Sequence, residues 1–253
     1  MEKKSSKRKK SQKRSSEASK KVVFPGQIIP TDSEKTTRVG RGLLVKENSL
    51  IASRCGILIE KKNGKLDVES KVRFYIPETE DVVIGVVVEK HAESYRLEIG
   101  TTHPARLNTL AFEGASKRNR PNIAVGALVY CRVEVADKDI ETELTCISQY
   151  IKKDWVTGES LYGELKEGHQ FKCSLPLARK LFLGTAAVLA ELEKHGIPFE
   201  IAAGVNGYVW VRSESPLNTI VIVNAIQNSD GMEHSAMTQM VAQLVRVAKS
   251  REQ

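Results

Sequence analysis

The sequence lacks any apolar stretch long enough to cross a lipid bilayer, which takes about 20 residues. It also has no apolar run before Val22, so its basic and polar start does not have the form of a secretory signal. These two absences predict a chain that is neither a membrane protein nor secreted, and we expect it in an intracellular compartment.

Cysteine is scarce and scattered. The residues Cys55, Cys131, Cys146 and Cys173 form no C-x-x-C pair, and no histidine lies at zinc-ligand spacing from them. A structural metal is therefore not expected. In a reducing compartment a free cysteine acts as a small apolar residue, and all four have apolar or β-forming neighbours. The sequence predicts four buried thiols.

Motifs for nucleotide and catalytic chemistry are also missing. The sequence contains neither G-x-x-x-x-G-K-[ST] nor G-x-G-x-x-G, and the spacing of its 5 histidines indicates no catalytic pair. The richest acidic stretch, Asp137, Asp139, Glu141 and Glu143, falls between two expected strands, so we interpret it as a solvated turn rather than a two-magnesium site. There Asp139 is expected to accept backbone N–H bonds. We expect no enzyme activity, no cofactor and no metal.

Positive charge is present, but it is concentrated at one end. Residues 1–21 hold ten Lys and Arg and two Glu, whereas the remaining 232 residues hold 29 residues of each sign. The net charge of +8 therefore belongs to the tail, and any nucleic-acid site on the neutral body must be a local patch. We expect the tail to be disordered. It serves either as a nuclear localisation signal or as a solubilising, weakly RNA-attracting arm.

Residues 22–77 read as a small β-barrel or β-sandwich module. Strands are expected at 40–45, 50–60 and 65–75, the last two joined by Asn63-Gly64, a pair that favours a type I′ hairpin turn. At the start of the module, Phe24-Pro25-Gly26-Gln27 predicts a structural turn, with Gly26 free to adopt a conformation closed to other residues.

Residues 78–152 read as a five-stranded barrel of the OB type. The expected strands are 82–89, 95–100, 105–111, 127–135 and 141–147, with a long insertion before the fourth and no long helix between them. Such barrels bind single-stranded nucleic acid through an exposed strand face and loops.

Residues 155–253 change to an α+β pattern after a linker at 155–163. Strands are expected at 170–174, 199–203 and 208–212, with helices at 177–182, 186–195, 217–227 and 236–249. The order strand, helix, helix, strand, strand, helix is that of a KH-type domain. Trp210 alternates with Tyr208 along an expected strand, so we predict that it packs in the core.

One concentrated basic patch lies in the body, Lys117-Arg118-Asn119-Arg120, within the insertion of the barrel. Arginine and lysine suit phosphate oxygens, and asparagine can bond a base edge or a ribose hydroxyl. We interpret the patch as an RNA-binding loop, the alternatives being a solvated loop or a protein-docking patch. His103, in another barrel loop, is a further candidate for base stacking, with a structural loop role as the alternative.

A family resemblance rests on three short sequence motifs. They are Phe24-Pro25-Gly26, the run from Ala111 to Asn122 (AFEGASKRNRPN), and Gly204-Val205-Asn206-Gly207. Together they resemble the ribosomal RNA-processing protein 40 family of exosome cap subunits, from about Val22 to the end of the chain. Ser116 and the long basic tail depart from that pattern.

The resemblance implies a non-catalytic subunit with an S1-type barrel and a KH domain. Its N-terminal domain would dock on a ring of RNase-PH-like subunits beside other cap subunits, with no membrane partner. Single-stranded RNA would pass the barrel toward a separate catalytic exoribonuclease, for 3′-to-5′ processing and decay in the nucleus, nucleolus and cytoplasm. Alternatives are a free-standing S1/KH RNA-binding protein and the sister cap subunit of the exosome. A polynucleotide phosphorylase fragment would have its KH module before the barrel.

The third module is expected to lack the usual KH grip on RNA. That grip uses a Gly-x-x-Gly loop between the first two helices, but this junction reads Leu183-Gly184-Thr185-Ala186, with one glycine. The Gly-x-x-Gly motif at 204–207 instead lies between two expected apolar strands. There Asn206 and Gly207 are expected to supply the positive φ angles of a tight turn, shaping the fold or an interface with the barrel.

Overall fold

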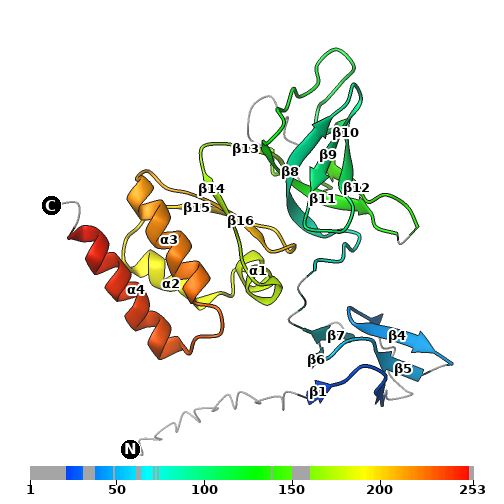
Figure 1. The fold of residues 1–253 in the computed structure, drawn as a ribbon, viewed down its shortest axis with the longest axis horizontal. Helices are drawn as coiled ribbons and strands as arrows, with labels where there is room; N and C mark the ends of the chain where they lie inside the picture. The colour runs from blue at the N-terminus through cyan, green and yellow to red at the C-terminus, as the bar shows by residue number, and fades with distance from the viewer. Residues whose placement is uncertain are drawn as a thin grey trace, which may run out of the picture. The chain divides into compact units, whose positions relative to one another are not determined.

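The computed structural model describes residues 21–30, 38–47, 49–60, 64–70, 72, 74–137, 139–149 and 160–250. The chain divides into two compact units, residues 1–70 and 71–253 (Figure 1). The predicted tail lies outside the described residues except for Lys21, which begins the first strand, and so does most of the linker predicted at 155–163. No helix in the described part of the chain is both long and apolar enough to cross a membrane.

The first unit is built from two small sheets around one core. One sheet has the order β1-β6-β7-β3 and the other β2-β5-β4. Val23, Ile29, Leu43, Leu50, Ala52 and Val68 form the buried core. The strands are β1 (Lys21–Val23), β2 (Ile28–Ile29), β3 (Arg38–Val39), β4 (Leu43–Lys46), β5 (Ser49–Ala52), β6 (Gly56–Glu60) and β7 (Lys65–Glu69).

The predicted strand at 50–60 is wrong as a single element. It is two strands in different sheets, because the chain turns after Ala52, where the Ser53 N–H donates to the Gly42 carbonyl at 2.9 Å. The predicted strand at 40–45 is likewise interrupted by a turn in which Gly42 has φ +73°. The third strand ends at Glu69, not at Tyr75, whose side chain is buried in the barrel core.

The two turns that the sequence indicates in this unit have different outcomes. Gly26 has φ +83° and donates its N–H to the Ala52 carbonyl at 2.8 Å, which confirms a structural turn. Strands β6 and β7 pair antiparallel, with Glu60 opposite Leu66, as expected of a hairpin. Asn63 lies outside the described residues, so the type I′ turn stays a prediction.

The barrel confirms the five strands expected for an OB-type fold. Their order is β12-β10-β9-β8-β11, and β11 also pairs with β12, which closes the barrel (Figure 1). Alternate side chains of each strand fill the interior, as the period of two requires. The strands are β8 (Val82–Lys90), β9 (Ser94–Glu98), β10 (Ala105–Phe112), β11 (Leu128–Val135) and β12 (Glu143–Cys146).

A sixth strand, β13 (Gly163–Leu165), extends this sheet from β11, with Leu128 opposite Leu165. The sequence assigned Gly163 to a linker, and that assignment is wrong. A three-residue strand carries too little alternation to be recognised. It forms because the edge of β11 offers backbone partners.

The KH-type order is confirmed. The sheet has the order β14-β16-β15, and helices α2, α3 and α4 pack against one another beside it (Figure 1). Ser174 caps α1 by accepting the Leu177 N–H at 3.3 Å. The elements are β14 (His169–Lys172), α1 (Leu175–Phe182), α2 (Ala187–Lys194), β15 (Glu200–Ala203), β16 (Tyr208–Arg212), α3 (Pro216–Asn228) and α4 (His234–Lys249).

Two of the four cysteines, Cys131 and Cys146, are buried as expected, and Cys173 is half-buried. Burial raises the pKa of the Cys131 and Cys146 thiols far above the usual value, and raises that of the half-buried Cys173 to about 12. These groups stay protonated and unreactive at neutral pH. The prediction is wrong for Cys55, which is exposed between β5 and β6.

The barrel and the KH-type domain are joined through the turn between β15 and β16. The buried Asn206 amide donates to the carbonyls of Ile84 at 2.8 Å and Ile99 at 2.9 Å, and its oxygen accepts the Ile84 N–H at 3.3 Å. The Val205 N–H donates to the Val82 carbonyl at 2.9 Å. The Gly-x-x-Gly motif at 204–207 therefore forms an interface with the barrel, as predicted.

The predicted turn geometry at this position is half right. Gly207 has φ +87°, but Asn206 is not among the described residues with positive φ. The Gly207 N–H donates to the Gly204 carbonyl at 3.2 Å and the Gly204 N–H to the Tyr208 carbonyl at 2.9 Å. This is a three-residue hairpin loop in which one left-handed glycine follows an ordinary turn. Asn206 is thereby free to turn its side chain toward the barrel.

Gly204 lets the two domains approach closely, and Gly168 makes room for Trp210 within the KH-type domain. A Cβ on Gly204 would lie 2.7 Å from the Ile84 nitrogen, and one on Gly168 would overlap the Trp210 indole. Trp210 packs with Ile84 and Tyr208 in a separate buried cluster, which confirms the predicted core role. Its indole N–H has no hydrogen-bond partner in the described part of the chain.

We predict that Asn206→Ala lowers the free energy of unfolding by about 3 kcal/mol, because it leaves buried backbone groups of Ile84 and Ile99 without partners. Denaturant unfolding of the full chain measures this change. Asn228→Ala, at the exposed end of α3, is the matched control and should change stability by no more than about 0.5 kcal/mol. Equal stability of the two variants would show that the Asn206 contacts do not support the fold.

Candidate nucleic-acid interface

The predicted basic patch sits on a tight turn in the segment that joins β10 to β11. The Ser116 N–H donates to the Asn119 carbonyl at 2.8 Å, and the Asn119 N–H reaches the Ser116 carbonyl and hydroxyl, both at 3.1 Å. Lys117 and Arg118 occupy the tip of this turn and are exposed. Ser116, at which the sequence departs from the family pattern, is thus the residue that closes the turn.

The turn is fastened to the barrel from both sides. On the outside, the Arg120 guanidinium donates to the Ala92 carbonyl at 3.1 Å, in the β8–β9 hairpin. From the core, the Tyr95 hydroxyl donates to the Pro121 carbonyl at 2.6 Å and accepts the Ile123 N–H at 3.2 Å. The basic side chains are therefore displayed on a fixed support.

Tyr95 and Phe112 are 1% and 3% exposed and belong to the barrel core, so neither ring is available to stack on a base. The exposed chemistry of the loop is instead its cations. Arg120 uses one donor for Ala92 and keeps others for a ligand, because a guanidinium has five N–H groups. Lys90 adds a charge nearby, where it donates to the Asn122 side chain.

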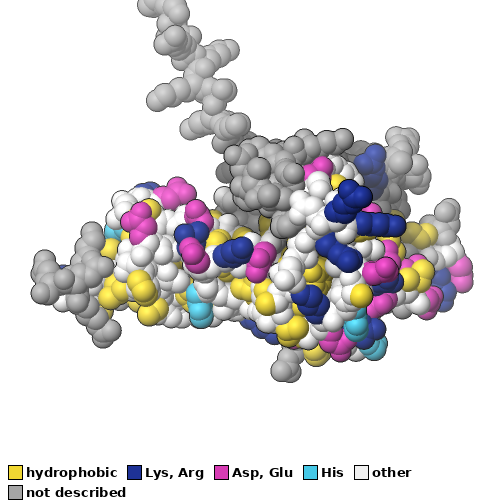
Figure 2. Space-filling model, turned by 90° about the horizontal axis from the view of Figure 1, so that it is seen from above, with side chains coloured by type: hydrophobic (Ala, Val, Ile, Leu, Met, Phe, Trp, Pro, Cys, Tyr) yellow, Lys and Arg dark blue, Asp and Glu magenta, His cyan; other side chains and the backbone are white. Residues whose placement is uncertain are grey.

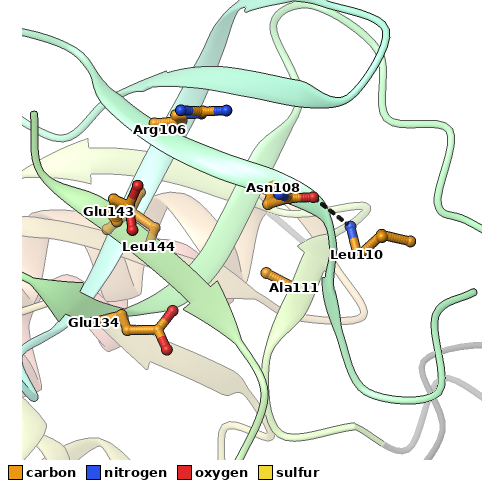
Figure 3. A pocket seen from close by; sticks show the side chains of 7 residues that line it. All are labelled: Arg106, Asn108, Leu110, Ala111, Glu134, Glu143 and Leu144. Carbon is orange, nitrogen blue, oxygen red and sulfur yellow. Dashed lines mark hydrogen bonds between the residues drawn. The ribbon is translucent and has the colours of Figure 1, made fainter.

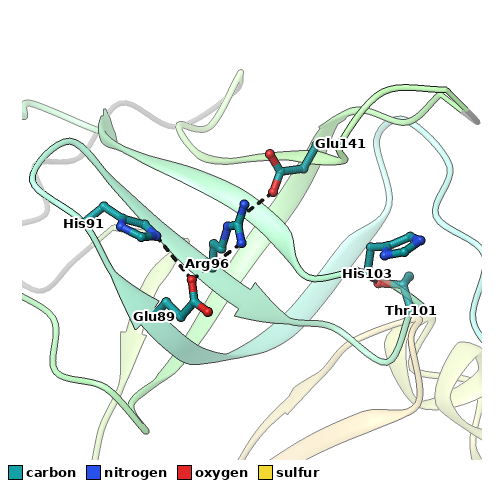
Figure 4. Close-up of polar contacts among 6 residues, drawn as sticks. All are labelled: Glu89, His91, Arg96, Thr101, His103 and Glu141. Carbon is teal, nitrogen blue, oxygen red and sulfur yellow. Dashed lines mark hydrogen bonds and ion pairs between the residues drawn. The ribbon is translucent and has the colours of Figure 1, made fainter.

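His103 does not lie with this loop. It is exposed in the turn between β9 and β10, where its carbonyl accepts the Thr101 hydroxyl at 2.6 Å (Figure 4). The basic loop lies beside the hairpin at the other end of these strands, and five residues of β9 correspond to about 17 Å. His103 lines a separate cavity of about 770 Å³ with Arg96, Ile140 and Glu141.

Two arginines that belong to no basic run in the sequence lie between these ends. Arg96 on β9 and Arg106 on β10 are directly opposite in the antiparallel pair, and both face outward. Arg96 lies 3.6 Å from Glu89 and 3.7 Å from Glu141, and His91 approaches the same Glu89 carboxylate (Figure 4). Such long, exposed ion pairs contribute about 1 kcal/mol at most, so phosphate can displace them.

Arg106 also borders a cavity of about 330 Å³ on the outer face, with Asn108, Glu134 and Glu143 (Figure 3). The cavity lies where the pairing of β10 with β12 shifts register between Leu107 and Phe112. The Asn108 side-chain oxygen accepts the Leu110 N–H at 3.0 Å, which leaves its amide N–H groups for a ligand. This face therefore combines phosphate-binding and base-edge donors with nearby carboxylates.

Charge on the barrel is mixed rather than uniform. In the view of Figure 2, Lys and Arg side chains lie among Asp and Glu side chains on the visible surface. This agrees with the even charge of the body, in which Lys117, Arg118 and Arg120 are the concentrated basic residues.

The acidic turn between β11 and β12 is closed by the side chain of Asp137. The Asp137 carboxylate accepts the Asp139 N–H at 3.0 Å, so Asp137 is the turn-forming acceptor and Asp139 supplies the donor. A carboxylate that bonds the backbone two residues ahead is a common way to close a turn, and the acceptor role expected of Asp139 stays a prediction. Among the described residues, no three or more His, Cys, Asp or Glu side chains form a group that could hold a metal ion.

The junction between α1 and α2 lacks the KH phosphate clamp. Gly184 has φ +65°, and Phe182 and Leu183 beside it are 42% and 68% exposed. The Gly-x-x-Gly motif lies instead between β15 and β16, where it is buried against the barrel. At the α1–α2 junction itself, the N–H groups of Gly184 and Thr185 donate to the carbonyls of Leu181 at 3.0 Å and Lys180 at 2.9 Å, so they close the end of the helix.

Comparison with known proteins agrees with the fold. A family model described as the S1 domain of exosome complex component RRP40 matches residues 75–157, and a KH-domain model matches residues 168–217. A crystal structure of a putative exosome complex RNA-binding protein has the same fold, with a TM-score of 0.54 at 18% identity, over 72% of this chain and 100% of that one.

Two relatives extend the likeness over most of the chain. The putative exosome complex component rrp40 of Dictyostelium discoideum is 42% identical over 208 residues, which are 82% of this chain and 85% of that protein. Exosome complex component rrp40 of Schizosaccharomyces pombe is 39% identical over 232 residues, 88% and 94% of the two chains. With its barrel, its KH-type domain and its Gly-x-Asn-Gly turn in place, the chain belongs to the RRP40 family of exosome complex components.

Proposed function

We propose that this chain is a non-catalytic, RNA-binding cap subunit of an exosome-type assembly. One observation carries the proposal: the exposed Lys117 and Arg118 stand on a turn fastened to an OB-type barrel by Arg120 and Tyr95. Family membership supports it, since the relatives are named exosome complex components and the structural neighbour is described as RNA-binding.

In this proposal, single-stranded RNA contacts the barrel by two kinds of groups. Lys117, Arg118 and the remaining donors of Arg120 bind phosphates, and Asn119 bonds a base edge or a ribose hydroxyl. The RNA then crosses the outward face of the barrel. There Arg106 and Asn108 add hydrogen-bond donors, and Arg96 gives up its ion pairs with carboxylates to bind a phosphate. His103, at the far end of this face, stacks on a base.

The first unit supplies the contact with the assembly. It exposes large apolar side chains that its own small core does not need, among them Phe24, Ile28, Leu44 and Val45. A monomer has little reason to keep so many on one small unit, whereas a docking surface does. The proposed partners are RNase-PH-like ring subunits and other cap subunits, with a separate exoribonuclease for cleavage, in the nucleus, nucleolus and cytoplasm.

We expect the Lys117→Ala/Arg118→Ala double variant to bind single-stranded RNA more weakly. Its plot of log affinity against log salt should be flatter by about 1.4, since each lost phosphate contact removes about 0.7. Fluorescence anisotropy at several salt concentrations measures this. The Lys46→Ala/Arg246→Ala variant is the matched control, because it removes two positive charges elsewhere, one on β4 and one on α4. Its slope should equal that of the unaltered chain. Equal slopes for both variants would remove the loop from the interface.

The purified full chain should leave labelled RNA intact in the presence of Mg²⁺, because its acidic turn holds a backbone N–H rather than converging on a metal. Gel analysis over several hours checks this. Shortening of the RNA that disappears in an Asp139→Asn variant would show that the turn is catalytic after all.

Size-exclusion chromatography of the protein from its own cells tests the assembly. We expect it to elute with ring and cap subunits at a mass far above that of one chain. Elution as a monomer that binds RNA tightly by itself would favour the free-standing alternative.

A further inference from the structure

A second surface that suits RNA lies where the barrel meets the KH-type domain. A groove of about 580 Å³ is lined there by three segments that are far apart in the sequence. We call it the junction groove and define it by Asn122, Tyr130, Tyr162, Lys166, Trp210 and Arg212. None of these residues belongs to the outer barrel face described above.

The groove has an apolar floor and an aromatic wall. Phe112, Ile123 and Trp210 are at most 6% exposed and form the floor. Tyr130 on β11 and Tyr162 next to β13 are partly exposed, with ring centroids 5.6 Å apart and planes tilted by 43°. A concave apolar site with a few polar groups at its edge is the usual form of a ligand site.

Cations stand at the rim beside this wall. Lys166 lies 3.4 Å from Glu164, and Arg212 lies 2.7 Å from Glu167. The side chains of Lys166 and Glu167 are more than 70% exposed, so these pairs are weak and exchangeable. The groove is near neutral as a whole, which suits stacking of bases better than capture of phosphates alone.

The groove continues directly from the proposed RNA-binding loop. Arg120 is followed by Pro121, Asn122 and Ile123, and these three residues line the groove. The Tyr95 hydroxyl holds Pro121 and Ile123 in place, so loop and groove form one rigid surface. RNA held at Lys117 and Arg118 therefore has an aromatic platform within a few residues of its phosphate contacts.

We propose that the junction groove binds a base of the same single-stranded RNA, with Tyr162 as the stacking platform and Lys166 at the adjacent phosphate. The inference rests on the proposed RNA-binding function and extends it. In place of the missing Gly-x-x-Gly clamp, the KH-type domain contributes one wall of a site that it shares with the barrel. Stacking makes this site tolerant of base identity, since every base has a π face.

The test uses the full chain and uridine oligonucleotides of about 4 and about 12 nucleotides, within the range of site sizes seen for OB folds. Tyr162→Leu should weaken binding of the longer oligonucleotide on the order of tenfold, the usual effect of losing one stacked base. It should leave the shorter one, held by the basic loop, unchanged. Tyr162→Phe is the matched control and should bind both like the unaltered chain.

Each other outcome has a defined meaning. If Tyr162→Leu binds the longer oligonucleotide as tightly as Tyr162→Phe does, the groove holds no base and the inference is wrong. If Tyr162→Leu keeps its RNA affinity but no longer joins the assembly, the groove is a protein contact, which also overturns it. If the unaltered chain binds neither oligonucleotide, the proposed RNA-binding function itself fails. Thermal unfolding of both variants separates these results from loss of fold.

Discussion

A single buried side-chain amide, that of Asn206, holds the barrel and the KH-type domain in a fixed register. Its oxygen and both of its N–H groups are used, and all three bonds end on barrel backbone at Ile84 and Ile99. Backbone groups of a closed barrel cannot move independently, so the contact fixes orientation as well as distance. The flanking glycines permit it, because a side chain on Gly204 would collide with the Ile84 nitrogen.

This arrangement explains why a KH-type domain without a phosphate clamp keeps the rest of its fold. Its hairpin turn is committed to the barrel, and its sheet supplies Tyr208 and Trp210 to a cluster shared with Ile84. The KH-type domain thereby packs against β8, β11 and β13 and stabilises them. Those strands in turn position the loop at 117–120 and the wall of the junction groove.

The fold was predictable from sequence wherever the pattern was long. The barrel strands alternate over four to nine residues, and α1 has a regular apolar face, so the barrel and the KH-type domain were both predicted in the right order. The strands of the first unit were not recoverable in this way. Arg38–Val39 is two residues long and exists because β7 offers it a parallel partner, a long-range fact that no local pattern contains.

The candidate site divides along the same line. Lys117, Arg118 and Arg120 are contiguous, so their charge is visible in the sequence, although their role in binding stays a prediction. Arg96 and Arg106 come from different strands and meet only through the register of β9 and β10. The outward positions of those strands could have been read from their alternation. The junction groove could not, since Tyr130, Tyr162 and Arg212 are brought together by packing between domains.

Strand β8 has buried side chains on both of its faces, Val83 and Val87 toward the barrel interior and Ile84 toward the KH-type sheet. A strand shared by two cores cannot leave one of them without exposing the other, so the barrel and the KH-type domain unfold as one cooperative body. Thermodynamic linkage then follows. A ligand that touches only the barrel protects the helices of the KH-type domain from opening, and their amide hydrogens exchange more slowly when it is bound.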